Sequence, residues 1–153
     1  MNALTLLEDD HKTIKRLLAE GEETTERAEK TRAEIYDRLK SFLEIHERIE
    51  EEVLYPALRS HPRSKEIALE AYEEHHVVDE IFEELEATPT TSEKWGAKFK
   101  VAQENLEHHI EEEEGDMFKK ARQIFSDDEL EQMGKRMEEI RSLAKQVEAT
   151  AAK

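Results

Sequence analysis

Residues 35–54, IYDRLKSFLEIHERIEEEVL, contain the pattern that decides the fold. Their apolar side chains recur at steps of three and four residues, the spacing that keeps one face of an α-helix turned toward a core. This inward face comprises Ile35, Leu39, Phe42, His46, Ile49 and Val53. The stretch therefore predicts a long amphipathic helix with one polar residue, His46, in its apolar stripe.

Three further segments show the same spacing, and each contains one histidine. The first comprises Leu4, Leu7, His11, Ile14 and Leu18. The second comprises Ala68, Ala71, His75, Val78, Phe82 and Leu85. The third comprises Phe99, Ala102, Leu106, His109, Glu113 and Met117. Four helices with one histidine each on the inward face favour a bundle that holds something polar in its interior.

Five segments are expected to be helical: 3–26, 31–59, 64–87, 93–124 and 127–149. Thr90 with Glu93, and Ser126 with Glu129, could form capping boxes at the starts of the last two. The predicted fold is all-α, an antiparallel up-and-down four-helix bundle over residues 1–124.

Residues 125–153 are expected to form an additional C-terminal helix that packs on the bundle within the same domain. Its apolar stripe comprises Leu130, Met133, Met137, Ile140, Leu143 and Val147. Because an exposed stripe of that length is unfavourable in water, it should pack across the bundle or against a second subunit. The protein could therefore be a monomer or a homodimer.

The composition supports long helices and narrows the function. The chain has 153 residues, 41% of them charged, with only four Gly and three Pro and a formal net charge of −16. Such charge repels phosphate backbones and anionic lipid, so we expect no nucleic-acid and no membrane partner. Without a spanning segment or a signal peptide, a cytoplasmic protein is expected. The absence of cysteine excludes thiolate metal sites, so nitrogen and oxygen would have to hold any metal.

The two halves of the chain repeat the same polar motifs. Asp10-His11 corresponds to Glu74-His75, and His46-x3-Glu50-Glu51 corresponds to His109-x3-Glu113-Glu114. Leu54-Tyr55 and Met117-Phe118 then follow at matching positions. The two histidines lie 35 residues apart in the first half and 34 in the second. Two helix pairs related in this way would present equivalent side chains to a shared midline.

We predict that six inward residues bind metal: His11, His46, Glu50, His75, His109 and Glu113. His46 with Glu50, and His109 with Glu113, lie four residues apart, so each pair meets on one helix face. Neutral imidazole and carboxylate suit iron, manganese or zinc. Six ligands are more than the four of a structural zinc, and they suit two ions that share carboxylates and keep open positions.

The remaining histidines and acids near these motifs have other expected roles. Glu47 and Glu114 are the acids that could also join the site. His76 and His108 each neighbour a predicted ligand but point about 100° away, so they are expected in an outer position or in solvent. His61 is expected in a surface turn. The alternative for the whole pattern is an acidic helical scaffold without metal, since a single histidine in a helical stripe is commonly a hydrogen-bonded core residue.

At these residues the chain resembles the hemerythrin-like family with the His-His-Glu cation-binding domain, over residues 1 to about 122. The resemblance rests on Asp10-His11, His46-x3-Glu50-Glu51-x2-Leu54-Tyr55-Pro56, Glu74-His75 and His109-x3-Glu113-Glu114. It is especially similar to small actinobacterial hemerythrin-like proteins. The resemblance implies an antiparallel four-helix bundle with two iron ions in an oxo- or hydroxo-bridged di-iron centre. The actinobacterial relatives imply a reaction with oxygen or hydrogen peroxide, with catalase-like peroxide breakdown favoured.

Two positions differ from the blood-type oxygen carriers of that family. Those carriers have a histidine pair four residues apart on the third helix, whereas Ala71 and Asp79 stand at that spacing from His75. They also place the acid of the fourth helix five residues after its histidine, which would be Glu114 instead of Glu113. Fewer histidines disfavour stable oxygen carriage. A non-catalytic module for oxygen or iron sensing remains an alternative, as does iron–sulfur cluster repair, although relatives with that activity carry cysteine.

Overall fold

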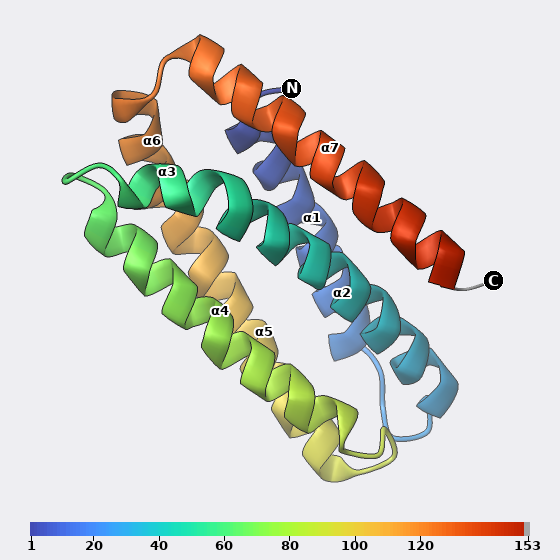
Figure 1. Cartoon of the computed structure of the whole chain (residues 1–153). Helices are drawn as coiled ribbons and strands as arrows, with labels where there is room; N and C mark the ends of the chain where they lie inside the picture. The colour runs from blue at the N-terminus through green and yellow to red at the C-terminus, as the bar shows by residue number, and fades with distance from the viewer. Residues whose placement is uncertain (152–153) are drawn as a thin grey trace.

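The computed structural model describes residues 1–151 as an antiparallel bundle of helices (Figure 1). The elements are α1 (Ala3–Glu22), α2 (Glu29–Ile49), η1 (Glu50–Leu54), α3 (Tyr55–Arg59), α4 (Lys65–Glu86), α5 (Glu93–Glu112), η2 (Glu113–Met117), α6 (Phe118–Ile124) and α7 (Asp127–Ala151). The π-helical turns η1 and η2 interrupt two otherwise continuous helices, α2 to α3 and α5 to α6. The predicted all-α bundle of four helices with a fifth at the C-terminal end is therefore confirmed. Across the described residues, none of these helices is both long and apolar enough to cross a membrane.

The first helix ends at Glu22, four residues earlier than predicted. The amide and hydroxyl of Thr24 both donate to the carbonyl of Gly21, at 3.2 and 2.6 Å, and this closes the last turn. Arg32 then donates to the hydroxyl of Thr24 and to the carbonyl of Thr90. These bonds join the two loops at one end of the bundle, and hydrophobic periodicity does not encode them.

The two predicted capping boxes have different outcomes. Ser126 and Glu129 form the box at α7, where each backbone N–H donates to the side chain of the other residue, at 3.0 and 3.2 Å. The box between Thr90 and Glu93 was predicted wrongly. Ser92 caps α5 instead, because it directly precedes the first helical residue while Thr90 lies in the turn before it.

Two apolar clusters fill the bundle on either side of the predicted ligands. One includes Leu4, Leu7, Ile49, Leu54 and Phe118. The other includes Ile14, Leu18, Leu39, Val78 and Phe99. The predicted inward residues of the four stripes are buried, except that Phe42 is half-buried beneath the guanidinium of Arg141. The polar residues between the clusters are therefore shielded from water at both ends.

The last helix, α7, packs across α1 and α2 (Figure 1). Its buried residues are Leu130, Gly134, Met137 and Ala144. Gly134 permits the close approach, because a Cβ at that position would overlap the carbonyl oxygen of Met1. The predicted stripe is wrong at its far end, where Leu143 and Val147 are 62% and 68% exposed. Beyond Met137 the helix turns Arg141 and Ala144 toward the bundle instead.

Candidate metal centre

The six predicted ligands meet in the middle of the bundle. His11 lies on α1, His46 on α2, His75 on α4 and His109 on α5, and the two glutamates are the first residues of η1 and η2. Each of the six residues is at most 5% exposed. Their ligand atoms form two overlapping groups, within each of which the atoms lie within 4.8 Å of one another. These groups are His11, His46, Glu50 and Glu113, and Glu50, His75 and His109.

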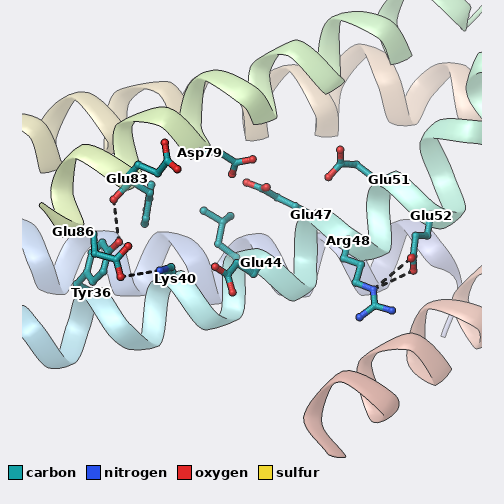
Figure 2. Close-up of a pocket in the computed structure, with 12 residues that line it drawn as sticks. Tyr36, Lys40, Glu44, Glu47, Arg48, Glu51, Glu52, Asp79, Glu83 and Glu86 are labelled. Atoms are coloured by element: carbon teal, nitrogen blue, oxygen red, sulfur yellow. Dashed lines mark hydrogen bonds and ion pairs between the residues drawn. The ribbon is translucent and has the colours of Figure 1, made fainter. Parts of the chain in front are cut away.

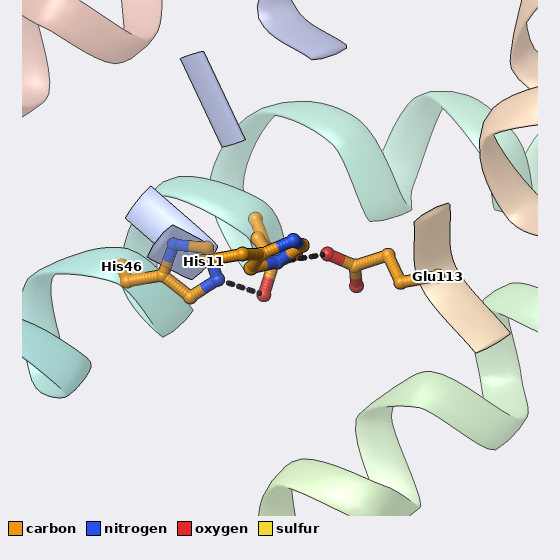
Figure 3. A group of neighbouring side chains, drawn as sticks. His11, His46 and Glu113 are labelled. Carbon is orange, nitrogen blue, oxygen red and sulfur yellow. Dashed lines mark ion pairs between the residues drawn. The ribbon is translucent and has the colours of Figure 1, made fainter. Parts of the chain in front are cut away.

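The four histidines form two pairs, His11 with His46 and His75 with His109. Glu113 lies between these pairs and offers one carboxylate oxygen to each. Its Oε1 lies 3.1 Å from Nε2 of His11, and its Oε2 lies 3.2 Å from Nε2 of His109. Figure 3 shows Glu113 extending toward His11, with His46 beside it. A carboxylate placed in this way is suited to bridge two cations.

Glu50 takes the equivalent position from the opposite side. Its Oε1 lies 3.1 Å from Nε2 of His46 and 3.1 Å from Nε2 of His75. Each of the two histidine pairs therefore faces both carboxylates. This arrangement can hold two cations, with two imidazole nitrogens for each ion and two shared carboxylates between them.

The two π turns set the direction of the side chains that follow each glutamate. A π turn closes hydrogen bonds between residues five apart, so one extra residue enters the turn. Accordingly, the N–H of Tyr55 donates to the carbonyl of Glu50, and the N–H of Phe118 donates to the carbonyl of Glu113. The fifth residue after each glutamate therefore faces the interior, and both Tyr55 and Phe118 are fully buried.

Tyr55 is a site residue that the sequence analysis missed. Its hydroxyl donates to Oε2 of Glu113 at 2.5 Å and lies 3.2 Å from Nε2 of His75 and 3.3 Å from Nε2 of His109. Burial raises the pKa of Tyr55 well above its ordinary value, and the charges of Glu113 and Glu50 raise it further. A regular α-helix would place residue 55 about 140° around the helix axis from residue 50. Helical periodicity therefore predicts that Tyr55 faces away from the site.

A second ring of carboxylates contacts the outer nitrogens of the histidines. The Nδ1 distances are 2.7 Å for His11 to Glu114, 2.9 Å for His46 to Asp10, 3.0 Å for His109 to Glu74 and 3.5 Å for His75 to Glu51. The repeat predicted from the sequence thus extends to these contacts, because Asp10 corresponds to Glu74 and Glu51 to Glu114. Such partners fix the tautomer and orientation of a histidine that binds metal.

The buried polar atoms of the cluster fit a bound cation. Within residues 1–151, Oε2 of Glu50 is buried without a hydrogen-bond partner, and Nε2 of His11 and Oε1 of Glu113 are buried in an ion-pair contact at 3.1 Å without hydrogen-bond geometry. Burying such groups unpaired costs free energy unless an ion or a proton satisfies them. Nitrogen and carboxylate oxygen in this number are the donors that non-heme iron, manganese or zinc accepts.

Carboxylates on both sides raise the pKa of the buried imidazoles. Burial lowers the pKa of His46, but the charge of Glu50 and the hydrogen bond to Asp10 outweigh it and raise the pKa to about 10. In the same way, burial lowers the pKa of His75 while Glu50 and Glu51 raise it to about 9. Without metal these imidazoles retain a proton, and a bound cation would replace it.

The other histidines and acids that the sequence analysis considered near the site lie outside the cluster of six predicted ligands. The side chains of His76 and His108 are 68% and 66% exposed, and each pairs with a glutamate one turn on. His61 lies in the turn before α4, where its Nδ1 accepts a backbone N–H. Glu114 contacts the outer nitrogen of His11, and Glu47 points into a groove between α2 and α4 (Figure 2).

The comparison with protein families matches this architecture. Residues 2–121 match the hemerythrin HHE cation binding domain. The chain belongs to this family. The match ends before α7, so the family domain covers the four bundle helices and their six buried histidines and glutamates.

Mycobacterial relatives of this HHE-family chain extend the likeness over nearly its whole length. It is 32% identical over 138 residues to the proteins Rv2633c of Mycobacterium tuberculosis and Mb2666c of Mycobacterium bovis, covering 90% of this chain and 83% of each relative. It is also similar to the crystal structure of an HHE domain-containing protein from Mycobacterium kansasii, a homologue of Rv2633c. That likeness has a TM-score of 0.81 and 31% identity, and it covers 99% of this chain and 90% of the other. The likeness includes α7.

Proposed function

We propose that this protein is a non-heme di-iron protein that reacts with oxygen or hydrogen peroxide, and that peroxide breakdown is its favoured reaction. The observation that carries the proposal is the pair of buried carboxylates between two histidine pairs. Glu50 and Glu113 supply negative charge between the two positions, which offsets the repulsion of two close cations. In the described chain, Oε2 of Glu50 has no hydrogen-bond partner there, and Nε2 of His11 and Oε1 of Glu113 contact only each other, without hydrogen-bond geometry.

Two iron ions held by His11, His46, His75, His109, Glu50 and Glu113 would supply two-electron redox chemistry. In peroxide disproportionation, one hydrogen peroxide is reduced to two waters with uptake of two electrons and two protons. A second hydrogen peroxide is oxidised to dioxygen and releases the same number of electrons and protons.

The protein supplies a narrow approach to this chemistry. A cavity of about 120 Å³ between α4 and the α5–η2 segment is lined by His109 and Glu113 together with Ile67 and Met117. A water molecule takes about 30 Å³ in the liquid, so only a few molecules of that size fit. The size of the cavity suits a small molecule such as hydrogen peroxide or oxygen.

Tyr55 is the residue best placed to hold a proton at the site. Its hydroxyl donates to Glu113, and its raised pKa keeps it protonated at neutral pH. On the opposite side, Phe118 stacks against His11 with ring centroids 6.2 Å apart and presents no polar atom. The chain therefore orients a proton donor beside the His75 and His109 pair and places an apolar ring against His11.

The first test is metal content. Protein from iron-supplemented cells should contain close to two irons per chain, and His46→Ala or His109→Ala should lose at least one of them. His76→Ala and His108→Ala are matched controls with exposed imidazoles, and both should keep the full complement. Iron-free protein that also refuses added ferrous iron would refute the di-iron proposal.

The second test is the reaction. Adding hydrogen peroxide to the diferric protein should release oxygen, measured with an oxygen electrode, while a Glu113→Ala, His109→Ala double variant serves as the blank. The alternative is a non-catalytic oxygen-binding module. It would be favoured by no oxygen release above the blank together with reversible uptake of oxygen gas by the reduced protein under cycles of vacuum.

A further inference from the structure

A groove lies between α2 and α4 (Figure 2). Its volume is about 620 Å³, and most of the polar groups that line it are acidic. Its two cations are already paired, Lys40 with Glu86 at 3.0 Å and Arg48 with Glu52 at 3.4 Å. Five acids have no lysine or arginine partner within residues 1–151: Glu44, Glu47, Glu51, Asp79 and Glu83. A concave surface of one charge sign concentrates ions of the opposite sign.

Glu47 is the buried acid of this groove. It is only 6% exposed, and its Oε1 has no hydrogen-bond partner in the described chain. Asp79 faces it from α4 across the groove (Figure 2). A buried carboxyl with a free oxygen is unfavourable unless a cation or a proton satisfies it.

His75 connects the groove to the metal centre through its two ring nitrogens. Nε2 lies 3.1 Å from Glu50 within the centre. Nδ1, on the other side of the ring, is buried without a hydrogen-bond partner and lies 3.5 Å from Oε2 of Glu51. The other three histidines hold their outer nitrogen against a carboxylate at 2.7 to 3.0 Å. Among the four, only His75 has an outer nitrogen that makes no hydrogen bond, and its distance to a carboxylate is the longest.

Ligand atoms of Glu47, Glu51 and His75 lie within 4.8 Å of one another. We propose that Glu47, Glu51 and Nδ1 of His75 form a docking site for a divalent cation on its way into the metal centre. Two carboxylate oxygens and one imidazole nitrogen suit Fe²⁺ or Mn²⁺. This proposal rests on the proposed function, because an uptake site presupposes a centre that is filled with metal.

The chemistry of imidazole links the two sites. An imidazole that keeps its N–H proton offers one lone pair, so His75 binds an ion through Nδ1 or through Nε2 but not through both. An ion at the docking site and an ion bound to His75 in the centre therefore exclude each other. The docking site holds a cation during loading and releases it once the position on His75 is filled.

Uptake of Fe²⁺ by the metal-free protein tests the proposal. Under anaerobic conditions, a chromogenic ferrous chelator traps unbound Fe²⁺ at set times after mixing. The Glu47→Gln, Glu51→Gln double variant removes both docking carboxylates and keeps the side-chain shape. The Glu44→Gln, Glu83→Gln double variant removes the same charge from the groove outside the cluster. We expect the first to take up Fe²⁺ at an initial rate roughly tenfold below that of the wild type and the second to stay within about twofold.

Equal slowing of the two double variants would show that the groove acts only through its total charge, and would overturn the docking site. Unchanged uptake in the Glu47→Gln, Glu51→Gln variant would overturn it as well. Glu51→Gln alone, at a side chain that is 40% exposed, provides a variant that folds without a buried substitution and should slow uptake in the same direction. A wild type that takes up no Fe²⁺ would overturn the proposed function itself, whereas normal filling with an unaltered rate would overturn only the docking site.

Discussion

Replacing Arg141 by methionine would show whether α7 takes part in the metal centre. The guanidinium of Arg141 donates to Oδ2 of Asp10 at 2.5 Å, and the same oxygen lies 2.9 Å from Nδ1 of His46. Burial raises the pKa of Asp10, but His46 and Arg141 outweigh it and hold the pKa below its ordinary value. A chain of three side chains thus connects the last helix to a predicted ligand. Methionine keeps most of the aliphatic stem and removes the charge.

The magnitude follows from the burial of the two partners. Asp10 is 4% exposed, so removing its cationic partner leaves a buried carboxylate with His46 alone. Losing a hydrogen bond between charged groups costs about 1.5–3 kcal/mol. The side chain of Arg141 is 22% exposed, so the loss stays below the 3–5 kcal/mol typical of breaking a fully buried pair. The guanidinium also lies 5.6 Å from the ring centroid of Phe42, a cation–π contact worth about 0.5–1 kcal/mol.

We therefore expect Arg141→Met to lower the free energy of unfolding of the metal-free protein by about 3 kcal/mol, measured by urea denaturation. For a domain of this size that corresponds to a fall of roughly 10 °C in Tm. Because Asp10 orients His46, metal affinity should also fall by roughly tenfold or more. Arg122→Met is the matched control, since Arg122 pairs with Glu8 at 3.3 Å on the surface and should change stability by less than about 0.5 kcal/mol.

Two results would refute this reasoning. If Arg141→Met and Arg122→Met change stability equally, the contact with Asp10 contributes no more than a surface pair. If stability falls while metal affinity stays at the wild-type value, α7 supports the fold but does not act on the metal centre through His46.

Two further substitutions test other features of the structure. Tyr55→Phe removes the hydroxyl beside His75 and His109 but keeps the ring, so the ion at that pair should bind roughly tenfold more weakly, measured by metal titration. An unchanged titration would mean that the hydroxyl does not act on the metal. Gly134→Ala should cost about 1–3 kcal/mol of stability because its Cβ overlaps the Met1 carbonyl. Gly115→Ala, with nothing within 4 Å of its Cβ, should be neutral or stabilising, and equal effects of the two would contradict the close approach of α7.

Most of the fold follows from hydrophobic periodicity. Each helix of a bundle buries one stripe of apolar residues, and these stripes can be recognised from the spacing of apolar residues in the sequence. The starts and ends of four helices agree with the predicted spans to within two residues, and the early end of α1 depends on Thr24 and Arg32. The inner face of α7 was only partly predictable. Packing there depends on the close backbone contact at Gly134 and on the ion pair of Arg141. Neither residue belongs to the pattern of apolar residues from which the helix faces were predicted.

The central cluster was predictable because its residues lie four apart on inward faces and are repeated in both halves. Tyr55 was not, since its position depends on the π turn that begins at Glu50 and shifts the helical register by one residue. The contact between Arg141 and Asp10 could not be predicted either, because 131 residues separate them in the chain. Glu47 was considered as a possible ligand, but only the packing of α2 on α4 shows that it faces the groove.

The repeat would give the two proposed metal positions equivalent ligands but different surroundings. At the His75 and His109 pair, Tyr55 supplies an additional oxygen, whereas Phe118 takes the corresponding place beside His11 and supplies none. The Tyr55 hydroxyl can donate a hydrogen bond beside that pair, and the Phe118 ring cannot. The small cavity also opens on the Tyr55 side, at His109 and Glu113. Since Tyr55, the small cavity and the groove at Glu47 and Glu51 all adjoin this half, the proposed mechanism predicts that approach and proton supply are concentrated at one of the two proposed positions.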